Sequence, residues 1–353
     1  MASDDFATRI IAWQRRHGRH DLPWQGTRDP YRIWVSEIML QQTQVATVIP
    51  YYQRFLARFP DVATLAATDE EAVLAHWSGL GYYARARNLH RAAQEIVAHH
   101  QGRIPADPRT LAALPGMGRS TAAAVAVFAF GTRAAILDGN VKRVLSRHAG
   151  IAGWPGDKRV EAQLWAVAEA RLPQQEVGGY SQGLMDLGAT ICTRARPACA
   201  LCPVHEDCVA RHTGRTGELP SPRPRKPLPE RAVAVLVLLA GDAVLLEKRP
   251  ATGVWGGLWS LPEALMEEDC AQVALRLGQR PLRSRALPAF MHDFTHFRLR
   301  IEPHLVEVQP VRQVAEPGRL WLPLSELQGA ALPAPVRRLL KGVAEERAWL
   351  IRS

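Results

Sequence analysis

The chain has 353 residues, of which 47% are hydrophobic and 22% are charged. This composition excludes a disordered chain and predicts two or three packed domains. No apolar run is long enough to cross a bilayer, and the first ten residues lack the basic-then-apolar order of a secretion signal, so we expect a cytoplasmic protein with no membrane partner. The 44 basic and 34 acidic side chains give a charge of +10, which suits a polyanionic partner but also fits an arginine-rich composition.

The first two thirds of the chain are expected to be helical. Phe6, Ile10 and Trp13 recur at helical spacing, and alanine-rich stretches such as 121–129 favour helix. Short Gly/Pro breaks separate these segments. We therefore predict a mainly α domain over residues 1–218.

A carboxylate stands in an apolar part of the segment 31–44. On a helix, Glu37 shares its face with Ile33, Trp34, Leu40 and Gln41. An acid in such surroundings resists ionisation and can hold a proton near neutral pH. The alternative is an exposed helical glutamate, which is the commoner case.

Residues 114–121 predict a tight turn that leads into a helix. Gly116 and Gly118 allow the backbone to approach a ligand closely, and Ser120 or Thr121 could cap the helix that follows. Free amides at such a turn bind phosphate well, although an ordinary helix–helix connection looks much the same. Asp138 follows after an alanine-rich stretch and could itself be a helix N-cap.

Four of the five cysteines lie close together, at Cys192, Cys199, Cys202 and Cys208. A disulfide framework would spread its cysteines more widely, so a metal or a cofactor is the better interpretation. Thiolates suit either a four-iron, four-sulfur cluster or a tetrahedral zinc ion, and the chemistry leaves both open.

Composition changes at residues 219–230, where proline alternates with basic residues, as is typical of an extended linker. Beyond it, the apolar run 233–239, a Gly241-Asp242 turn and residues 244–249 predict a β-hairpin. The alternating stretch 294–301 also predicts a strand. Residues 231–353 are therefore expected to form a separate α+β domain.

Several segments, taken in order, closely resemble the MutY-type adenine DNA glycosylases of the helix-hairpin-helix, endonuclease III-like superfamily. They are 22–24, 34–44, 79–88, 136–144 and 185–189. The cysteine spacing resembles that of the same superfamily, which implies one [4Fe-4S] cluster and a basic loop with Arg194 and Arg196, which could also be two solvated arginines. Residues 231–353 resemble the family's Nudix-like domain, through the stretch 255–262 in particular.

The resemblance implies a monomeric, monofunctional glycosylase of base excision repair. Its partner would be double-stranded DNA with adenine opposite 8-oxoguanine or guanine. Glu37 would be the acid at adenine, Asp138 would stabilise the sugar cation or transiently attack it, and Asn140 would arrange the site, unless it only caps a turn.

Further residues would bind DNA or the flipped base. Arg19, Leu22 and Trp24 resemble the wall of the adenine pocket, although Trp24 could be a core residue. Gln44 and Tyr82 resemble residues inserted beside the orphaned base, but both could be ordinary packing or surface residues. The remaining candidates are Gly116, Gly118 and Ser120 in the hairpin and Phe294, Thr295 and His296 in the C-terminal domain.

At two of these positions, Ser120 and Thr295, the residue differs from the one that related proteins carry. Lyase members of the superfamily carry a lysine where this chain has Ser120, which predicts little strand cleavage. Phe294-Thr295-His296 resembles a Phe-Ser-His loop that recognises 8-oxoguanine, with threonine in place of serine; His296 could instead line a strand edge.

The C-terminal domain lacks the acidic helix that a working Nudix hydrolase needs, so no nucleotide hydrolysis is expected. A bifunctional pyrimidine glycosylase and a non-catalytic DNA-binding iron–sulfur protein remain the alternative functions.

Overall fold

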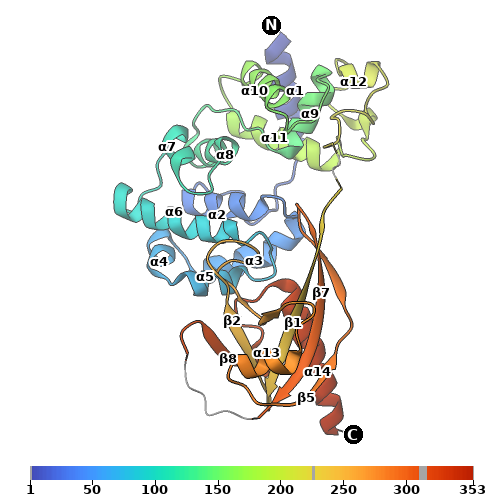
Figure 1. The fold of residues 1–353 in the computed structure, drawn as a ribbon. Helices are drawn as coiled ribbons and strands as arrows, with labels where there is room; N and C mark the ends of the chain where they lie inside the picture. The colour runs from blue at the N-terminus through green and yellow to red at the C-terminus, as the bar shows by residue number, and fades with distance from the viewer. Residues whose placement is uncertain (1, 225–226, 310–315, 353) are drawn as a thin grey trace. The chain divides into compact units, whose positions relative to one another are not determined.

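The computed structural model describes residues 2–224, 227–309 and 316–352 (Figure 1). The chain divides into two compact units, one of residues 1–67 and 88–225 and the other of residues 68–87 and 226–353. Among the described residues, no helix has both the length and the apolar character needed to cross a membrane.

The first unit is helical. Its elements are α1 (Ala2–His17), α2 (Pro30–Leu40), α3 (Val45–Arg58), α4 (Val62–Ala67), most of α6 (Ala84–His100), α7 (Pro108–Ala113), α8 (Arg119–Phe130), α9 (Gly139–Ala149), α10 (Lys158–Ala170), α11 (Val177–Thr190), the 3₁₀ turn η1 (Cys199–Leu201) and α12 (Val209–His212).

Aspartate side chains begin several of these helices. Asp29 accepts hydrogen bonds from the amides of Tyr31 and Arg32, and Pro30 in the first turn has no amide hydrogen to satisfy. Asp138 and Asp157 cap α9 and α10 in the same way.

The core of this unit lies where α1, α9 and α11 pack together. Ile10, Leu145 and Leu187 are fully buried there. Elsewhere, α2 packs against α8, and Trp34 of α2 is 0% exposed. This packing fixes the positions of α2, which carries Glu37, and of the start of α9, where Asp138 lies. These are the two carboxylates predicted to act in the site.

The second unit is α+β. Its elements are α5 (Glu70–Trp77), the start of α6, β1 (Glu230–Ala240), β2 (Ala243–Lys248), β3 (Trp259–Ser260), β4 (Glu263–Ala264), α13 (Cys270–Arg276), β5 (Pro281–Ala286), β6 (Phe290–Asp293), β7 (Arg298–Val308), β8 (Arg319–Pro323), the turn η2 (Leu324–Glu326) and α14 (Ala334–Arg352).

The described strands form one mixed sheet in the order β3-β2-β1-β7-β5, and in addition β4 pairs with β1, β6 with β7 and β8 with β2. β1 and β7 run parallel, and the other pairs are antiparallel. Alternate residues of β1 point to opposite faces, so Val237 packs with Leu340 of α14 and Leu236 packs with Val273 of α13.

The predicted hairpin is confirmed, because Leu239 of β1 pairs with Val244 of β2. The predicted strand over 294–301 is wrong in its first half. Residues 294–297 form the turn between β6 and β7, and the strand begins at Arg298. The two aromatic residues, Phe294 and Phe297, stand three positions apart with two exposed residues between them, which breaks the two-residue alternation of a strand and fits a turn.

Candidate active site

A cavity of about 390 Å³ opens in the helical unit, a size within the range of small-ligand sites. Arg19, Leu22, Trp24 and Glu37, all singled out from the sequence, line it together. The Trp24 ring is nearly perpendicular to the Tyr52 ring, with ring centroids 5.4 Å apart. Further lining residues are Gln14, Ile33, Ser36, Leu40, Phe128, Gln182 and Met185.

Glu37 projects from α2 into this cavity. Burial, and secondly the nearby Asp138 carboxylate, raise the pKa of Glu37 from 4.5 to about 8. The side chain is therefore mostly protonated at neutral pH, as the apolar spacing of the sequence predicts. A neutral carboxylic acid at the wall of a cavity can donate a proton to a bound base.

Asp138 lies at the start of α9. One carboxylate oxygen accepts from the Val141 amide at 2.7 Å, and the other accepts from the Asn140 side-chain amide at 3.3 Å. Burial raises the pKa of Asp138, against the lowering effect of these hydrogen bonds. The helix N-cap that the sequence offered as an alternative role for Asp138 is therefore present. It holds the Asp138 carboxylate close enough to Glu37 to raise the pKa of Glu37.

The Asn140 amide has a defined orientation. Its oxygen accepts from Arg143 Nη2 at 2.8 Å, which turns its nitrogen toward Asp138. The same guanidinium donates to the carbonyls of Gly188 at 2.7 Å and Cys192 at 2.8 Å. Arg143 thus joins α9 to the start of the cysteine loop.

A buried ion pair orients Arg19 at the cavity. Arg19 Nε donates to Asp186 Oδ1 at 2.7 Å, and the Arg19 backbone amide donates to the other oxygen at 3.0 Å. Gln182 also donates to Asp186 Oδ1 at 3.0 Å. The Asp186 side chain is 0% exposed, and these donors satisfy both of its oxygens.

The predicted tight turn is present at residues 114–118. Gly116 has φ +74°, and a Cβ there would lie 2.7 Å from Asn88, so glycine is required. A Cβ at Gly118 would meet nothing within 4 Å, which leaves its backbone open to a ligand. The predicted cap is wrong: α8 begins one residue after Gly118, and the Ser120 hydroxyl instead accepts from the Leu137 amide at 3.1 Å.

The two residues expected beside an orphaned base do not line the cavity. Gln44 is exposed at the start of α3. Tyr82, in the second unit, is 51% exposed with φ +50°, and the Arg85 guanidinium lies 5.5 Å from its ring centre.

The four clustered cysteines line one small cavity. Burial raises the pKa of Cys202 to about 12, and repulsion among the four sulfurs adds to this rise. Four thiolates would therefore need a cationic centre between them. Among the described residues, no group of three or more His, Cys, Asp or Glu side chains is arranged as a site for a single metal ion.

Arg147 organises the backbone of this loop. It is 2% exposed and donates to Cys192 Sγ at 3.3 Å, and to the carbonyls of Thr193, Arg194 and Leu219 at 2.7, 3.0 and 2.8 Å. This places a buried positive charge beside the thiol set. Arg194 and Arg196 themselves are exposed.

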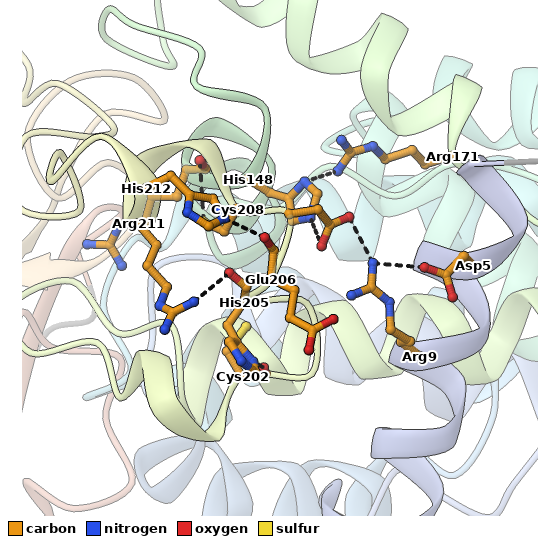
Figure 2. A network of polar contacts seen from close by, with 12 residues as sticks. Asp5, Arg9, His148, Arg171, Cys202, His205, Glu206, Cys208, Arg211 and His212 are labelled. Carbon is orange, nitrogen blue, oxygen red and sulfur yellow. Dashed lines mark hydrogen bonds and ion pairs between the residues drawn. The ribbon is translucent and has the colours of Figure 1, made fainter.

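A polar network fixes the far end of the loop (Figure 2). His148 Nδ1 accepts from Arg171 at 2.8 Å, and its Nε2 faces Asp207 at 3.3 Å. Burial, and then Arg171, lower the pKa of His148 to about 4, so the ring is neutral at pH 7. Arg9 of α1 donates to the other oxygen of Asp207 at 2.8 Å, which ties the loop to α1, α9 and α10.

In the second unit, Phe294, Thr295 and His296 occupy the turn between β6 and β7. Thr295 and His296 are exposed at its tip, and Phe294 is half-buried. His296 therefore does not line a strand edge.

Comparison with known proteins assigns both parts of the chain. Residues 35–170 match the HhH-GPD superfamily of base excision DNA repair proteins, and residues 233–342 match the NUDIX domain. An adenine DNA glycosylase of Buchnera aphidicola (strain APS) is 34% identical over 95% of this chain and 97% of its own. The human adenine DNA glycosylase is 33% identical over 95% of this chain and 73% of its own.

The chain belongs to the adenine DNA glycosylase family. It is a DNA glycosylase of base excision repair, with a helical domain of endonuclease III-like fold and a Nudix-like domain. Among solved structures, a thermostable thymine-DNA glycosylase is 30% identical with a TM-score of 0.55, over 60% of this chain and 97% of that one. A complex of endonuclease III with DNA matches in fold, at 22% identity and a TM-score of 0.51, over 61% of this chain and 98% of that one.

Sequence reasoning missed several residues of this adenine DNA glycosylase. Asp186 and Gln182, which orient Arg19, lie on α11 far along the chain from it. Arg143 and Arg147 resemble the other basic residues of an amphipathic helix, and only their spacing of four, which puts both on one helix face, could have suggested a common role.

Proposed function

We propose that this adenine DNA glycosylase removes adenine paired with 8-oxoguanine or guanine in double-stranded DNA, acting as a monomer. One observation carries the chemistry: Glu37 lines a cavity, where burial and the nearby Asp138 carboxylate raise its pKa to about 8. The base must leave the helical stack to reach such a cavity.

Glu37 is the acid of the proposed reaction. Adenine is a poor leaving group as an anion, so protonation of a ring nitrogen is needed before the glycosidic bond breaks. A pKa of about 8 keeps this carboxyl protonated at neutral pH and still acidic enough to transfer its proton.

Asp138 stabilises the cationic sugar that remains, or forms a transient bond to it, as in the two-carboxylate logic of sugar hydrolases. Asn140 orients Asp138 by donating to one of its oxygens. Water then adds to the sugar carbon from which adenine has departed, and its proton passes to the Glu37 carboxylate, which restores the acid.

The proposed adenine pocket is the 390 Å³ cavity, with Arg19, Leu22 and Trp24 in its wall. Gln44 and Tyr82 are each proposed to insert beside the orphaned base, which the exposure of each side chain permits. Gly116, Gly118 and Ser120 belong to a hairpin whose backbone would bind phosphate.

The enzyme is proposed to be monofunctional, because position 120 offers a hydroxyl and not the amine that a Schiff base requires. Purified enzyme should leave abasic sites intact. Borohydride trapping of a covalent DNA complex, lost on substitution of a lysine, would contradict this proposal.

Cys192, Cys199, Cys202 and Cys208 are proposed to hold one [4Fe-4S] cluster. The thiol donor set, the shared cavity and the buried charge of Arg147 fit such a group. When bound, it would hold the loop with Arg194 and Arg196 against DNA. Iron and sulfide analysis of the purified protein tests this, and zinc at one equivalent would overturn it.

The C-terminal domain, proposed as residues 231–353 beyond a linker of residues 219–230, would recognise 8-oxoguanine. Thr295 and His296 at the hairpin tip supply polar groups, and Phe294 supplies a ring. A chain truncated at residue 218 should lose its preference for 8-oxoguanine.

The deciding experiment is a single-turnover assay on a duplex with adenine opposite 8-oxoguanine, comparing the wild type with Glu37→Gln. Base loss only with the wild type is the expected result. Removal of a damaged pyrimidine with adenine left in place would mean that the substrate is wrong. No base loss by protein with full iron content would favour a binding protein.

A further inference from the structure

The hairpin tip of residues 294–297 is closed by its two outer aromatic residues. The Phe294 amide donates to the Phe297 carbonyl at 2.9 Å. The two rings stack across the turn, with centroids 4.5 Å apart and planes inclined by 17°. This closure leaves Thr295 and His296 exposed at the tip.

Two more rings hold Phe294 from the body of the domain. The His292 ring is perpendicular to the Phe294 ring, with centroids 4.6 Å apart, and the Trp255 ring centroid lies 5.7 Å from that of Phe294. The rings of Trp255 and His292 also pack against each other, with centroids 5.9 Å apart. Arg231 lies over Phe297, 4.7 Å from its ring centre, so each of the two outer rings is held by neighbours outside the turn.

Trp255 is itself fixed in an unusual backbone conformation. Its φ of +54° lies in the left-handed region, which residues other than glycine rarely adopt. Such a conformation persists only where the surrounding structure holds it. The next residue, Gly256, has no room for a side chain, because a Cβ there would lie 2.5 Å from the Ala251 carbonyl. Arg87, at the start of α6, donates to the Gly256 carbonyl.

We propose that Trp255, together with His292, is a positioning residue that holds Phe294 and thereby sets the hairpin tip for 8-oxoguanine recognition. This inference rests on the proposed role of the tip. Trp255 does not touch the base; it acts through Phe294. The contact from Arg87 extends the same support to the segment of residues 68–87, which carries Tyr82.

The test measures dissociation constants for duplexes with adenine opposite 8-oxoguanine and opposite guanine, in a Glu37→Gln background that prevents turnover. Trp255→Leu and His292→Leu should each reduce the ratio of the two constants by about tenfold, because small misplacements of a recognition group weaken binding strongly. Trp255→Phe keeps a ring in contact with Phe294 and should restore most of the ratio. Trp321→Leu is the matched control, because Trp321 is also half-buried but packs on the opposite face of the sheet.

A purely structural role for Trp255 would lower the urea midpoint of unfolding, as Trp321→Leu does, without changing the ratio. That result would overturn the proposal. Should Trp255→Leu fail to fold, His292→Leu and Arg87→Gln decide the question, since neither removes a large core side chain.

His296→Ala and Thr295→Val separate this inference from the function on which it rests. If they reduce the ratio and the Trp255 and His292 variants do not, the tip reads the base but the ring cluster does not position it. If neither tip variant changes the ratio, the proposed role of the hairpin fails, and the positioning role fails with it.

Discussion

Glu37 should make both activity and stability depend on pH in a defined way. With a pKa of about 8, the protonated fraction falls from about 90% at pH 7 to about 10% at pH 9. If the protonated form is the active one, the single-turnover rate should fall about tenfold over this range. Rates measured with enzyme in excess over an adenine:8-oxoguanine duplex report this step directly.

The same shift has a stability counterpart of known sign. Folding raises the pKa of Glu37 from 4.5 to about 8, so the folded state keeps a proton that the unfolded state releases. Stability is therefore lost as the pH rises from 4.5 to 8, by at most about 3 kcal/mol at pH 7. Glu37→Gln removes the ionisable group, and should abolish base removal while raising the urea midpoint at pH 7.

Glu267→Gln, at an exposed position of the other unit, is the control and should leave both properties unchanged. A wild-type rate that stays flat from pH 7 to pH 9, or a Glu37→Gln variant less stable than the wild type at pH 7, would refute the assignment of a neutral, buried acid.

Three further outcomes test other parts of the structure. Arg147→Met removes a buried guanidinium that donates to several acceptors, so it should lower the free energy of unfolding by about 3 kcal/mol and also lower the iron content of the purified protein. A variant with the iron content and the stability of the wild type would contradict this. Gly188→Ala would place a methyl group 2.6 Å from Asn140 Cβ, so single-turnover rates should fall, whereas Gly217→Ala, with open space around it, should match the wild type. Asp157→Ala removes the cap of α10 and should cost about 1 kcal/mol in urea unfolding without changing the rate of base removal.

The sequence predicted the parts of the site that depend on local pattern. The helical spacing around Glu37 indicated an apolar setting, and its raised pKa confirms that setting. Asp138 before a glycine indicated an N-cap, and the cap is present. In both cases the signal lies within one turn of helix.

Contacts between distant segments were not foreseen. Asp186 meets Arg19 across 167 residues, and no local pattern marks either as a partner of the other. The capping role considered for Ser120 was likewise wrong, because its hydroxyl accepts from the Leu137 amide beyond the helix and not from an amide of its own first turn. The grouping of residues 68–87 with the C-terminal unit also depends on long-range contacts, such as that of the Tyr83 hydroxyl with the Leu332 carbonyl at 3.1 Å.

Asp138 both caps α9 and faces the proposed reaction, which limits the substitutions that this position can tolerate. The oxygen that accepts from Val141 begins α9, and the same carboxylate faces the proposed reaction. Random substitution at this position therefore removes chemistry and weakens the fold in one event, so most inactive variants will also be poorly expressed ones. Asparagine, like serine and threonine, keeps a capping oxygen while removing the charge, and it is the closest of the three to aspartate in shape, so Asp138→Asn is the replacement that best isolates the chemical loss.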